Sequence, residues 1–161
     1  MNLGGNREHF WGEYDNSLFK CLKSVYPDYD WLPWKFRNKY DFFEENEENA
    51  KVFLDWVQKN QRMKDLSGWY QMPYSTFREL GGGPLLNKHG SLYNLLKTVY
   101  PEYPWIAWKF PKVPIHFWNS KENQIKFMEW AKSQLQIKEV DDWYNVSTRV
   151  RLLFFVHIPI K

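Results

Sequence analysis

The sequence predicts an all-α protein made of two tandem small helical bundles, each with about three or four helices. Three observations lead to this prediction: an internal repeat of about 74 residues, apolar residues at helical spacing in both copies, and prolines and glycines where helices should begin or end. The chain has 161 residues, of which 20% are aromatic, so both bundles have enough large side chains to fill a core.

The repeat is visible without gaps. Residues 17–70 lie over residues 91–144, and 20 of the 54 pairs are identical. Four tryptophan pairs recur: Trp31 with Trp105, Trp34 with Trp108, Trp56 with Trp130, and Trp69 with Trp143. We therefore expect a first repeat over 1–72, a second over 73–150 and an atypical apolar tail over 151–161. The pattern is interrupted at both ends, so we expect a fragment of a longer array or the product of an incorrect gene model.

The first helix of each copy follows from its apolar spacing. From Leu92 to Val99 apolar residues occupy positions i, i+3, i+4 and i+7, which form one face of a helix. Ser91 stands where an N-cap is needed, and Pro101 should stop the helix. The first copy repeats this arrangement between residues 17 and 27. We therefore expect equivalent helices in the two copies.

The later elements are predicted from prolines, caps and glycines. The W-x2-W-K-F segment is flanked by prolines, so we expect an extended connection there. A longer helix should follow at roughly 47–60 and 121–136, with Asn119 and Glu122 as a capping box, and a short helix at Val140–Tyr144. Between the copies, PYSTFRELGGG places Pro73 at a helix start and three glycines as a stop signal.

Composition and the length of apolar runs limit the classes of protein and the locations that suit this chain. The formal charge of +3 is too small to identify a nucleic-acid binder by itself. The single cysteine, Cys21, excludes an internal disulfide, and Leu95 replaces it in the other copy, so we expect a small buried apolar residue. The longest apolar run, LLFFVHIPI, is about half of what a membrane-spanning helix needs. We expect no membrane span and an intracellular location, without distinguishing cytoplasm from nucleus.

The sequence contains no recognisable catalytic or metal-binding motif. The four histidines match no ligand spacing, and no nucleophile elbow occurs. The glycines of LGGGPLL lack the lysine and serine of a phosphate-binding loop, and no strand precedes them. We therefore predict a protein that is not an enzyme and has neither a cofactor nor a metal.

Lysines next to aromatic residues are the candidate binding residues. Lys23 recurs as Lys97 and Lys35 as Lys109, and residues 80–118 hold four lysines against one acid, Glu102. A basic stripe with interleaved rings suits phosphate contact and base stacking, so we predict nucleic-acid binding. The stacking rings would be Trp105 or Trp108. The alternative is a protein-interaction or scaffold repeat, whose tryptophans are purely structural and whose partners are other proteins or further repeats.

The motif SL-x3-LL-x2-VYPEY-x-W-x2-WKF, followed by FW, NQ-x2-F-x2-W and DWY, resembles an uncharacterised Trp-rich tandem repeat of predicted eukaryotic proteins, largely fungal and algal. The resemblance covers roughly Leu3 to Val150. The first copy departs from it, with Phe43-Glu44 where Phe117-Trp118 stands and Ala50 where Gln124 stands. More distantly, the glycine turn before a Ser-Leu helix is similar to helical repeats associated with homing endonucleases and some helicases, which implies nucleic-acid binding without assigning a site.

Overall fold

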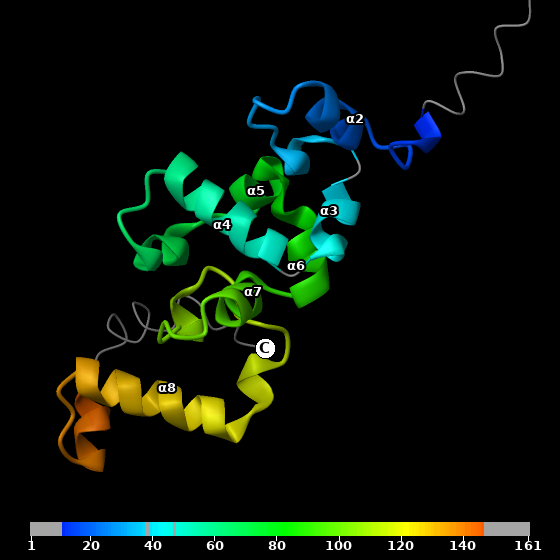
Figure 1. Cartoon of the computed structure of the whole chain (residues 1–161). Coiled ribbons are helices and arrows are strands. Elements are labelled where there is room, and N and C mark those ends of the chain that lie inside the picture. The colour runs from blue at the N-terminus through cyan, green and yellow to red at the C-terminus, as the bar shows by residue number, and fades with distance from the viewer. Residues whose placement is uncertain (1–10, 38, 47, 147–161) are drawn as a thin grey trace, which may run out of the picture. The chain divides into compact units, whose positions relative to one another are not determined.

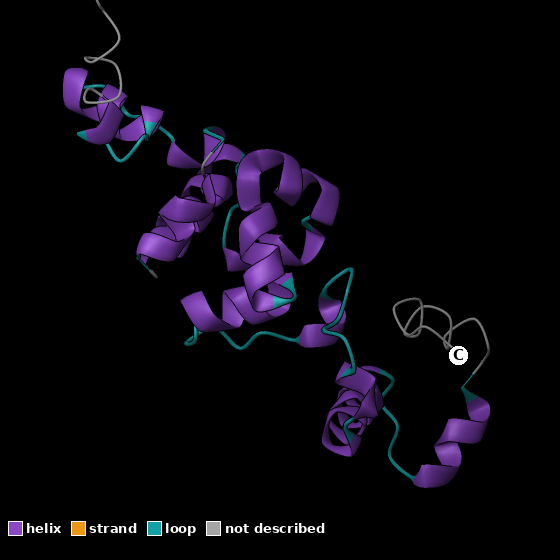
Figure 2. Ribbon diagram, turned by 90° about the vertical axis from the view of Figure 1, so that its right-hand side faces the viewer, coloured by secondary structure: helices purple, strands orange, loops and turns teal. Residues whose placement is uncertain are grey.

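The computed structural model describes residues 11–37, 39–46 and 48–146. Every regular element among these residues is a helix of α, 3-10 or π type, and no strand occurs in this part of the chain (Figure 2). The all-α class predicted from the sequence is therefore confirmed for the described residues.

The chain divides into two compact units that are not continuous in sequence. The first unit takes the residues up to Met63 together with Tyr74–Lys88, and the second takes Lys64–Pro73 together with the residues from His89 onward. The boundary between compact units thus differs from the boundary between sequence repeats. Residues 74–88, which begin the second repeat, fold with the first unit.

The first unit opens with helix α2 (Leu18–Val25, blue in Figure 1), which begins and ends as its sequence predicts. The Ser17 hydroxyl accepts a hydrogen bond from the Lys20 backbone N–H, and Cys21 is buried in the helix. The W-x2-W-K-F segment then differs from the predicted extended connection. Its centre is a short 3-10 helix, η1 (Pro33–Lys35), because proline fits the first turn of a helix, where its missing N–H has no partner to lose.

Helices α3 (Lys39–Glu45) and α4 (Glu48–Asn60) complete the first half of this unit. One stripe of α4 is fully buried because its apolar residues recur at helical spacing. It consists of Ala50, Phe53, Leu54 and Val57. Around Phe53 the rings of Trp34, Phe43 and Trp56 have centroids 5.3, 5.4 and 6.2 Å away, so the core of this unit is largely aromatic.

The glycine-rich segment interrupts the helical path at Gly81, and a new helix follows at once. Helix α5 (Tyr74–Phe77) runs into a π-type turn, η3 (Arg78–Gly82), and helix α6 (Gly83–His89) follows at once. Only Gly81 of the three glycines is left-handed, with φ of 112°. The predicted stop therefore falls at Gly81, whose φ and ψ of 112° and −1° are not helical, and Gly83 already has helical φ and ψ again.

The second unit contains the 3-10 helix η2 (Leu66–Gln71), helix α7 (Leu92–Val99) and two further short 3-10 helices. These are η4 (Ala107–Lys109) and η5 (Phe117–Asn119). Ser91 caps α7 as predicted, since its hydroxyl accepts from the Asn94 N–H at 3.1 Å. Like η1, helix η4 replaces the extended connection that its prolines predict.

Helix α8 (Lys121–Gln134) is followed by the 3-10 helix η6 (Val140–Asn145), drawn yellow and orange in Figure 1. The predicted capping box of Asn119 and Glu122 is wrong. Ser120 is the N-cap and accepts from the Asn123 N–H, while Glu122 forms an ion pair with Lys126 one turn along the helix. That partner lowers the pKa of Glu122, and Glu122 raises the pKa of Lys126.

Elements of the same type lie at a constant separation. Helices α2 and α7, η1 and η4, and η2 and η6 each begin 74 residues apart. Between η1 and α4 in the first unit, and between η4 and α8 in the second, the residue-by-residue correspondence of the two copies shifts by one position. The Phe42 and Phe43 rings contact each other and Trp34 or Phe53, and Phe117 and Trp118 do the same with Trp108 and Phe127. Phe43 therefore takes the place of Trp118, whereas the ungapped sequence match sets Glu44 there.

Candidate nucleic-acid interface

A Tyr–Trp corner follows the first helix of each repeat and fixes one recurring tryptophan. The Trp31 indole N–H donates to the Tyr26 carbonyl at 3.2 Å, and the Trp105 indole N–H donates to the Tyr100 carbonyl at 3.0 Å. In each corner a second tyrosine packs on the indole, with Tyr29 4.5 Å from Trp31. The prolines that end both helices make this tight return of the chain possible.

Each of the four predicted lysines lies over an aromatic ring. The Nζ atoms of Lys23 and Lys97 are 5.9 and 6.0 Å from the ring centroids of Phe19 and Tyr93. Lys35 lies 5.9 Å from Trp56, and Lys109 lies 5.7 Å from Tyr70. Such cation–π contacts hold an ammonium group near a ring without neutralising its charge.

The same four lysines form no ion pair with a carboxylate of the described residues. Other lysines differ: Lys51 pairs with Asp55 at 2.8 Å, and Lys88 pairs with Glu44 at 3.4 Å. All four predicted lysines are exposed to solvent. Their positive charges are therefore available to an external anion.

In the second unit, Lys97 and Lys109 flank one continuous cluster of rings. Tyr93, below Lys97, contacts Phe110 at 5.9 Å, and Phe110 contacts Tyr70 at 4.8 Å, below Lys109. The Trp105 ring joins both Tyr70 and Phe110. The structure thus brings together three of the predicted site residues, Lys97, Trp105 and Lys109, around this ring cluster.

Tyr70 anchors that cluster and was not predicted as a site residue. Its hydroxyl accepts a hydrogen bond from the Ile106 backbone N–H at 3.0 Å. Burial raises the pKa of the Tyr70 phenol, and the Ile106 hydrogen bond opposes that rise. Tyr70 therefore keeps its proton at neutral pH. The recurrence of the WY pair at residues 69–70 and 143–144 was the only sequence signal for it.

Trp108 has a different surrounding from Trp105. Its ring packs against Phe117, Phe127 and Trp130, at 6.4, 5.5 and 5.9 Å, and its indole nitrogen is buried without a hydrogen-bond partner in the structure. The corresponding Trp34 is only 4% exposed. Each of the two rings therefore packs mainly within its own unit. Trp34 packs against the long helix α4, and Trp108 packs against the long helix α8.

A groove in the first unit places Lys23 next to aromatic side chains. It has a volume of about 800 Å³, and Tyr29, Trp31 and Trp56 line it together with Lys23 and Lys59. Tyr29 is 64% exposed, which makes it the most accessible ring of the corner. Three aspartates, Asp28, Asp30 and Asp55, also line the groove and weaken its positive potential.

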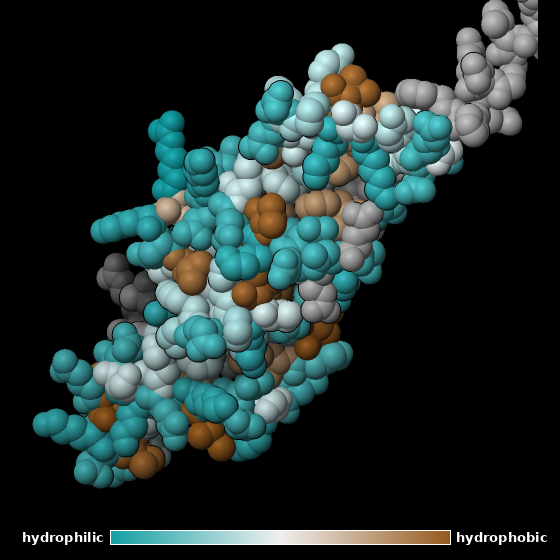
Figure 3. All heavy atoms as spheres, in the orientation of Figure 1, coloured by the Kyte–Doolittle hydropathy of each residue, from teal (hydrophilic) through white to brown (hydrophobic). Residues whose placement is uncertain are grey.

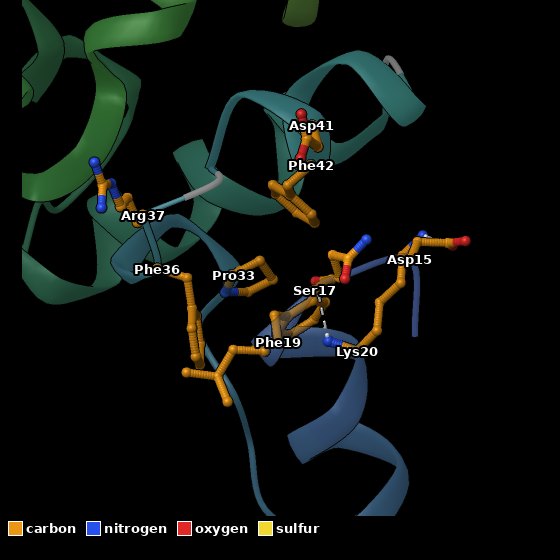
Figure 4. Close-up of a pocket in the computed structure, with 11 residues that line it drawn as sticks. Asp15, Ser17, Phe19, Lys20, Pro33, Phe36, Arg37, Asp41 and Phe42 are labelled. Atoms are coloured by element: carbon orange, nitrogen blue, oxygen red, sulfur yellow. Dashed lines mark hydrogen bonds and ion pairs between the residues drawn. The ribbon is translucent and has the colours of Figure 1, made fainter. Parts of the chain in front are cut away.

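A second cavity in the first unit, of about 410 Å³, lies between α2 and the start of α3 (Figure 4). Phe19, Pro33, Phe36 and Phe42 make its walls apolar. Charged groups lie at its edge, among them an ion pair of 2.9 Å between Lys20 and Asp15. None of the predicted lysines lines this cavity, so it is separate from the candidate interface.

Other site types have no support among the described residues. No group of three or more His, Cys, Asp or Glu side chains there could hold a metal ion. His9 and His157 lie outside the described residues. No helix in the described part of the chain is both long and apolar enough to cross a membrane. Comparison with protein-family models, curated proteins and solved structures finds no match for this chain.

Proposed function

We propose that this protein is a non-enzymatic helical repeat module that binds nucleic acid through its exposed lysines and the rings beneath them. One observation supports this most directly: Lys23, Lys35, Lys97 and Lys109 are exposed, lie over aromatic rings and form no ion pair with a described carboxylate. Their positions correspond in the two repeats.

The second unit is the stronger half of the proposed interface. Lys97 and Lys109 would each contact a phosphate, and a base would stack on the edge of the ring cluster next to Trp105, which is half-buried. Stacking of one base on an aromatic side chain contributes about 1–3 kcal/mol. Trp108 is the less suitable stacking ring, because it is held between Phe117 and Phe127.

The first test measures binding to single-stranded and duplex nucleic acid by fluorescence anisotropy at several salt concentrations. Counterion release predicts that affinity falls steeply as salt rises. The double variant Lys97→Ala with Lys109→Ala should bind about tenfold or more weakly than the unchanged protein, and its salt dependence should be shallower.

The matched control is Lys51→Ala with Lys126→Ala, which removes the same amount of charge from two lysines that are already paired with carboxylates. This control should bind within about twofold of the unchanged protein. An equal loss in both double variants would mean that only net charge matters. Absent binding to every strand type would refute the proposed function.

We further propose that the chain is a tandem of two copies of one helical bundle, as the offset of 74 residues between like elements suggests. Its partners would include further repeats of the same type. An intracellular location remains a prediction from the single cysteine, Cys21, whose thiol is buried.

A protein-interaction module is the second candidate function. It is favoured by apolar side chains on the outer face of α8, where Ile125 is 48% exposed and Met128 is 40% exposed. Contiguous apolar surface of this type is typical of protein-binding sites.

A further inference from the structure

In the second unit, one tyrosine joins the 3-10 helix η2 to the segment that follows α7. The Tyr70 hydroxyl accepts a hydrogen bond from the Ile106 N–H at 3.0 Å. The centroid of the Tyr70 ring lies 5.7 Å from that of Trp105 and 4.8 Å from that of Phe110. Trp105, Ile106 and Phe110 together receive this tyrosine, and we call them the filled receiving site. Within it the Phe110 side chain is 0% exposed.

The first unit has a counterpart to each of these three residues, 74 positions earlier. They are Trp31, Leu32 and Phe36, and together we call them the open receiving site. The Trp31 and Phe36 ring centroids are 6.1 Å apart, against 5.8 Å between the two rings of the filled site. Leu32 has φ and ψ of −98° and 97°, against −106° and 104° for Ile106. The two receiving sites therefore share their backbone conformation and nearly share their ring spacing.

None of the residues described in the first unit occupies the open receiving site as Tyr70 occupies the filled one. The Leu32 N–H donates to no described acceptor, and Phe36 is half-buried where Phe110 is fully buried. Trp31 and Leu32 line the groove of about 800 Å³, and Phe36 lines the cavity of about 410 Å³ drawn in Figure 4. Solvent therefore reaches all three residues.

The counterpart of Tyr70 in the second repeat is Tyr144, whose side chain is 88% exposed. The helices that carry the two tyrosines, η2 and η6, are both six-residue 3-10 helices. The residues after them, Met72 and Val146, have φ and ψ of −71° and 113° and of −73° and 111°. The Tyr144 side chain has no hydrogen-bond or ring partner among the described residues. Tyr144 thus has the local backbone of Tyr70 without its contacts.

The rest of the visible surface favours a contact made by a few side chains. On the face drawn in Figure 3, apolar side chains form small, separate patches among hydrophilic ones. Binding energy at such surfaces is concentrated in a few rings and hydrogen bonds, and tyrosine is one of the side chains that contribute most. A side chain already held in its bound backbone conformation loses less entropy when it binds.

We propose that Tyr144 of one copy of this chain docks into the open receiving site of a second copy. The Tyr144 hydroxyl accepts from the Leu32 N–H, and its ring contacts Trp31 and Phe36, as Tyr70 contacts the filled site. The contact joins two different surfaces, so it links copies in a head-to-tail order. The inference rests on the proposed tandem of two like bundles and not on nucleic-acid binding.

Sedimentation velocity of the full chain over a series of concentrations, without nucleic acid, tests the proposal. The unchanged chain should form larger species as its concentration rises. Tyr144→Ala should weaken this association about tenfold or more, because it removes the ring at the centre of the contact. Tyr144→Phe should weaken it about two- to tenfold, because it keeps the ring and loses one hydrogen bond.

A mixing experiment tests whether the tyrosine and the open receiving site meet. Phe36→Leu keeps Tyr144 but changes a receiving ring, so this variant alone should also associate about tenfold more weakly. An equimolar mixture of Phe36→Leu and Tyr144→Ala should form a complex of one molecule of each and nothing larger. The tyrosine of the first variant then meets the intact receiving site of the second.

The matched control is Ile115→Ala, since Ile115 is 82% exposed and lies outside η6 and both receiving sites. It should associate like the unchanged chain. Tyr144→Ala should melt at the temperature of the unchanged chain and keep its affinity for nucleic acid, so the two proposals can fail separately.

Three results would each overturn the proposal. They are a chain that stays monomeric at every concentration, unchanged association of Tyr144→Ala, and a mixture of the two folded variants that forms no complex. If Phe36→Leu does not fold, as its thermal unfolding would reveal, the comparison of Tyr144→Ala with Ile115→Ala decides the question.

Discussion

Individual glycines decide how closely the backbone segments of the first unit approach. Gly81 combines φ of 112° with contact to the Trp34 carbonyl, and the site for a Cβ atom at Gly82 lies 2.2 Å from the Phe77 ring. Gly90 also has positive φ, 74°, but has open space around the Cβ position. The same residue type therefore meets two different demands, a backbone conformation at Gly90 and both conformation and space at Gly81.

We expect Gly81→Ala to destabilise the protein by about 2 kcal/mol or more, because the new methyl group adds a collision to the strain of a left-handed backbone. Gly90→Ala should cost about 1 kcal/mol, since only the strain applies there. Urea unfolding followed by tryptophan fluorescence would measure both. Equal losses in the two variants would show that the contact with Trp34 contributes nothing to stability.

At the scale of helices, the sequence predicts those elements whose ends are set by local chemistry. Helices α2 and α7 were predicted with their serine caps because a hydroxyl three residues before its donor is a local signal. Helix α6 and the turns η1 and η4 were missed. Glycine and proline usually break helices, so the sequence marks a break at Gly81 but does not show that a new helix begins directly after it, or that short helical turns form beside the prolines.

Some residues of the candidate site could be predicted from the sequence, and others could not. Lys23, Lys35, Lys97 and Lys109 could be chosen from the sequence because they recur beside aromatic residues. The ring beneath Lys109 could not, because Tyr70 lies 39 residues earlier and belongs to the preceding sequence repeat. The difference between Trp105 and Trp108 also needed the structure, since both occupy recurring positions in one short motif.

Truncation of a side chain to alanine should have different effects on stability at matching positions of the two long helices. Leu54→Ala should destabilise the protein by about 2–5 kcal/mol, because it leaves a cavity at a fully buried position. Met128→Ala should cost less than about 1 kcal/mol, because solvent already reaches that side chain. Thermal unfolding followed by circular dichroism would measure both losses of stability. A loss for Met128→Ala as large as that for Leu54→Ala would mean that the Met128 side chain is buried.

At the scale of the whole chain, the compact units and the sequence repeats have different boundaries. Residues 64–73 end the first repeat but fold with the second unit, and residues 74–88 begin the second repeat but fold with the first unit. A cut at the repeat boundary therefore separates parts that belong together in each unit. The stability of a fragment should then depend strongly on the residue at which it ends.

We expect a fragment ending at Lys88 to unfold at a clearly higher temperature than one ending at Met72. The longer fragment keeps Phe77 against Phe53 and Gly81 against Trp34, whereas the shorter one exposes the aromatic core there. Differential scanning calorimetry on both fragments would measure the effect. A fragment ending at Pro73 serves as the control and should behave like the shorter one. Equal melting of all three would mean that residues 74–88 do not stabilise the first unit.

The place of residues 74–88 in the first unit also has a consequence for how such a gene can change in length. Because the first unit is covered by residues encoded at the start of the second sequence copy, a duplication of 74 residues would carry such a segment for the copy before it, wherever within the unit the breakpoints fall. A chain lengthened by whole copies would thus keep the same junction between successive copies.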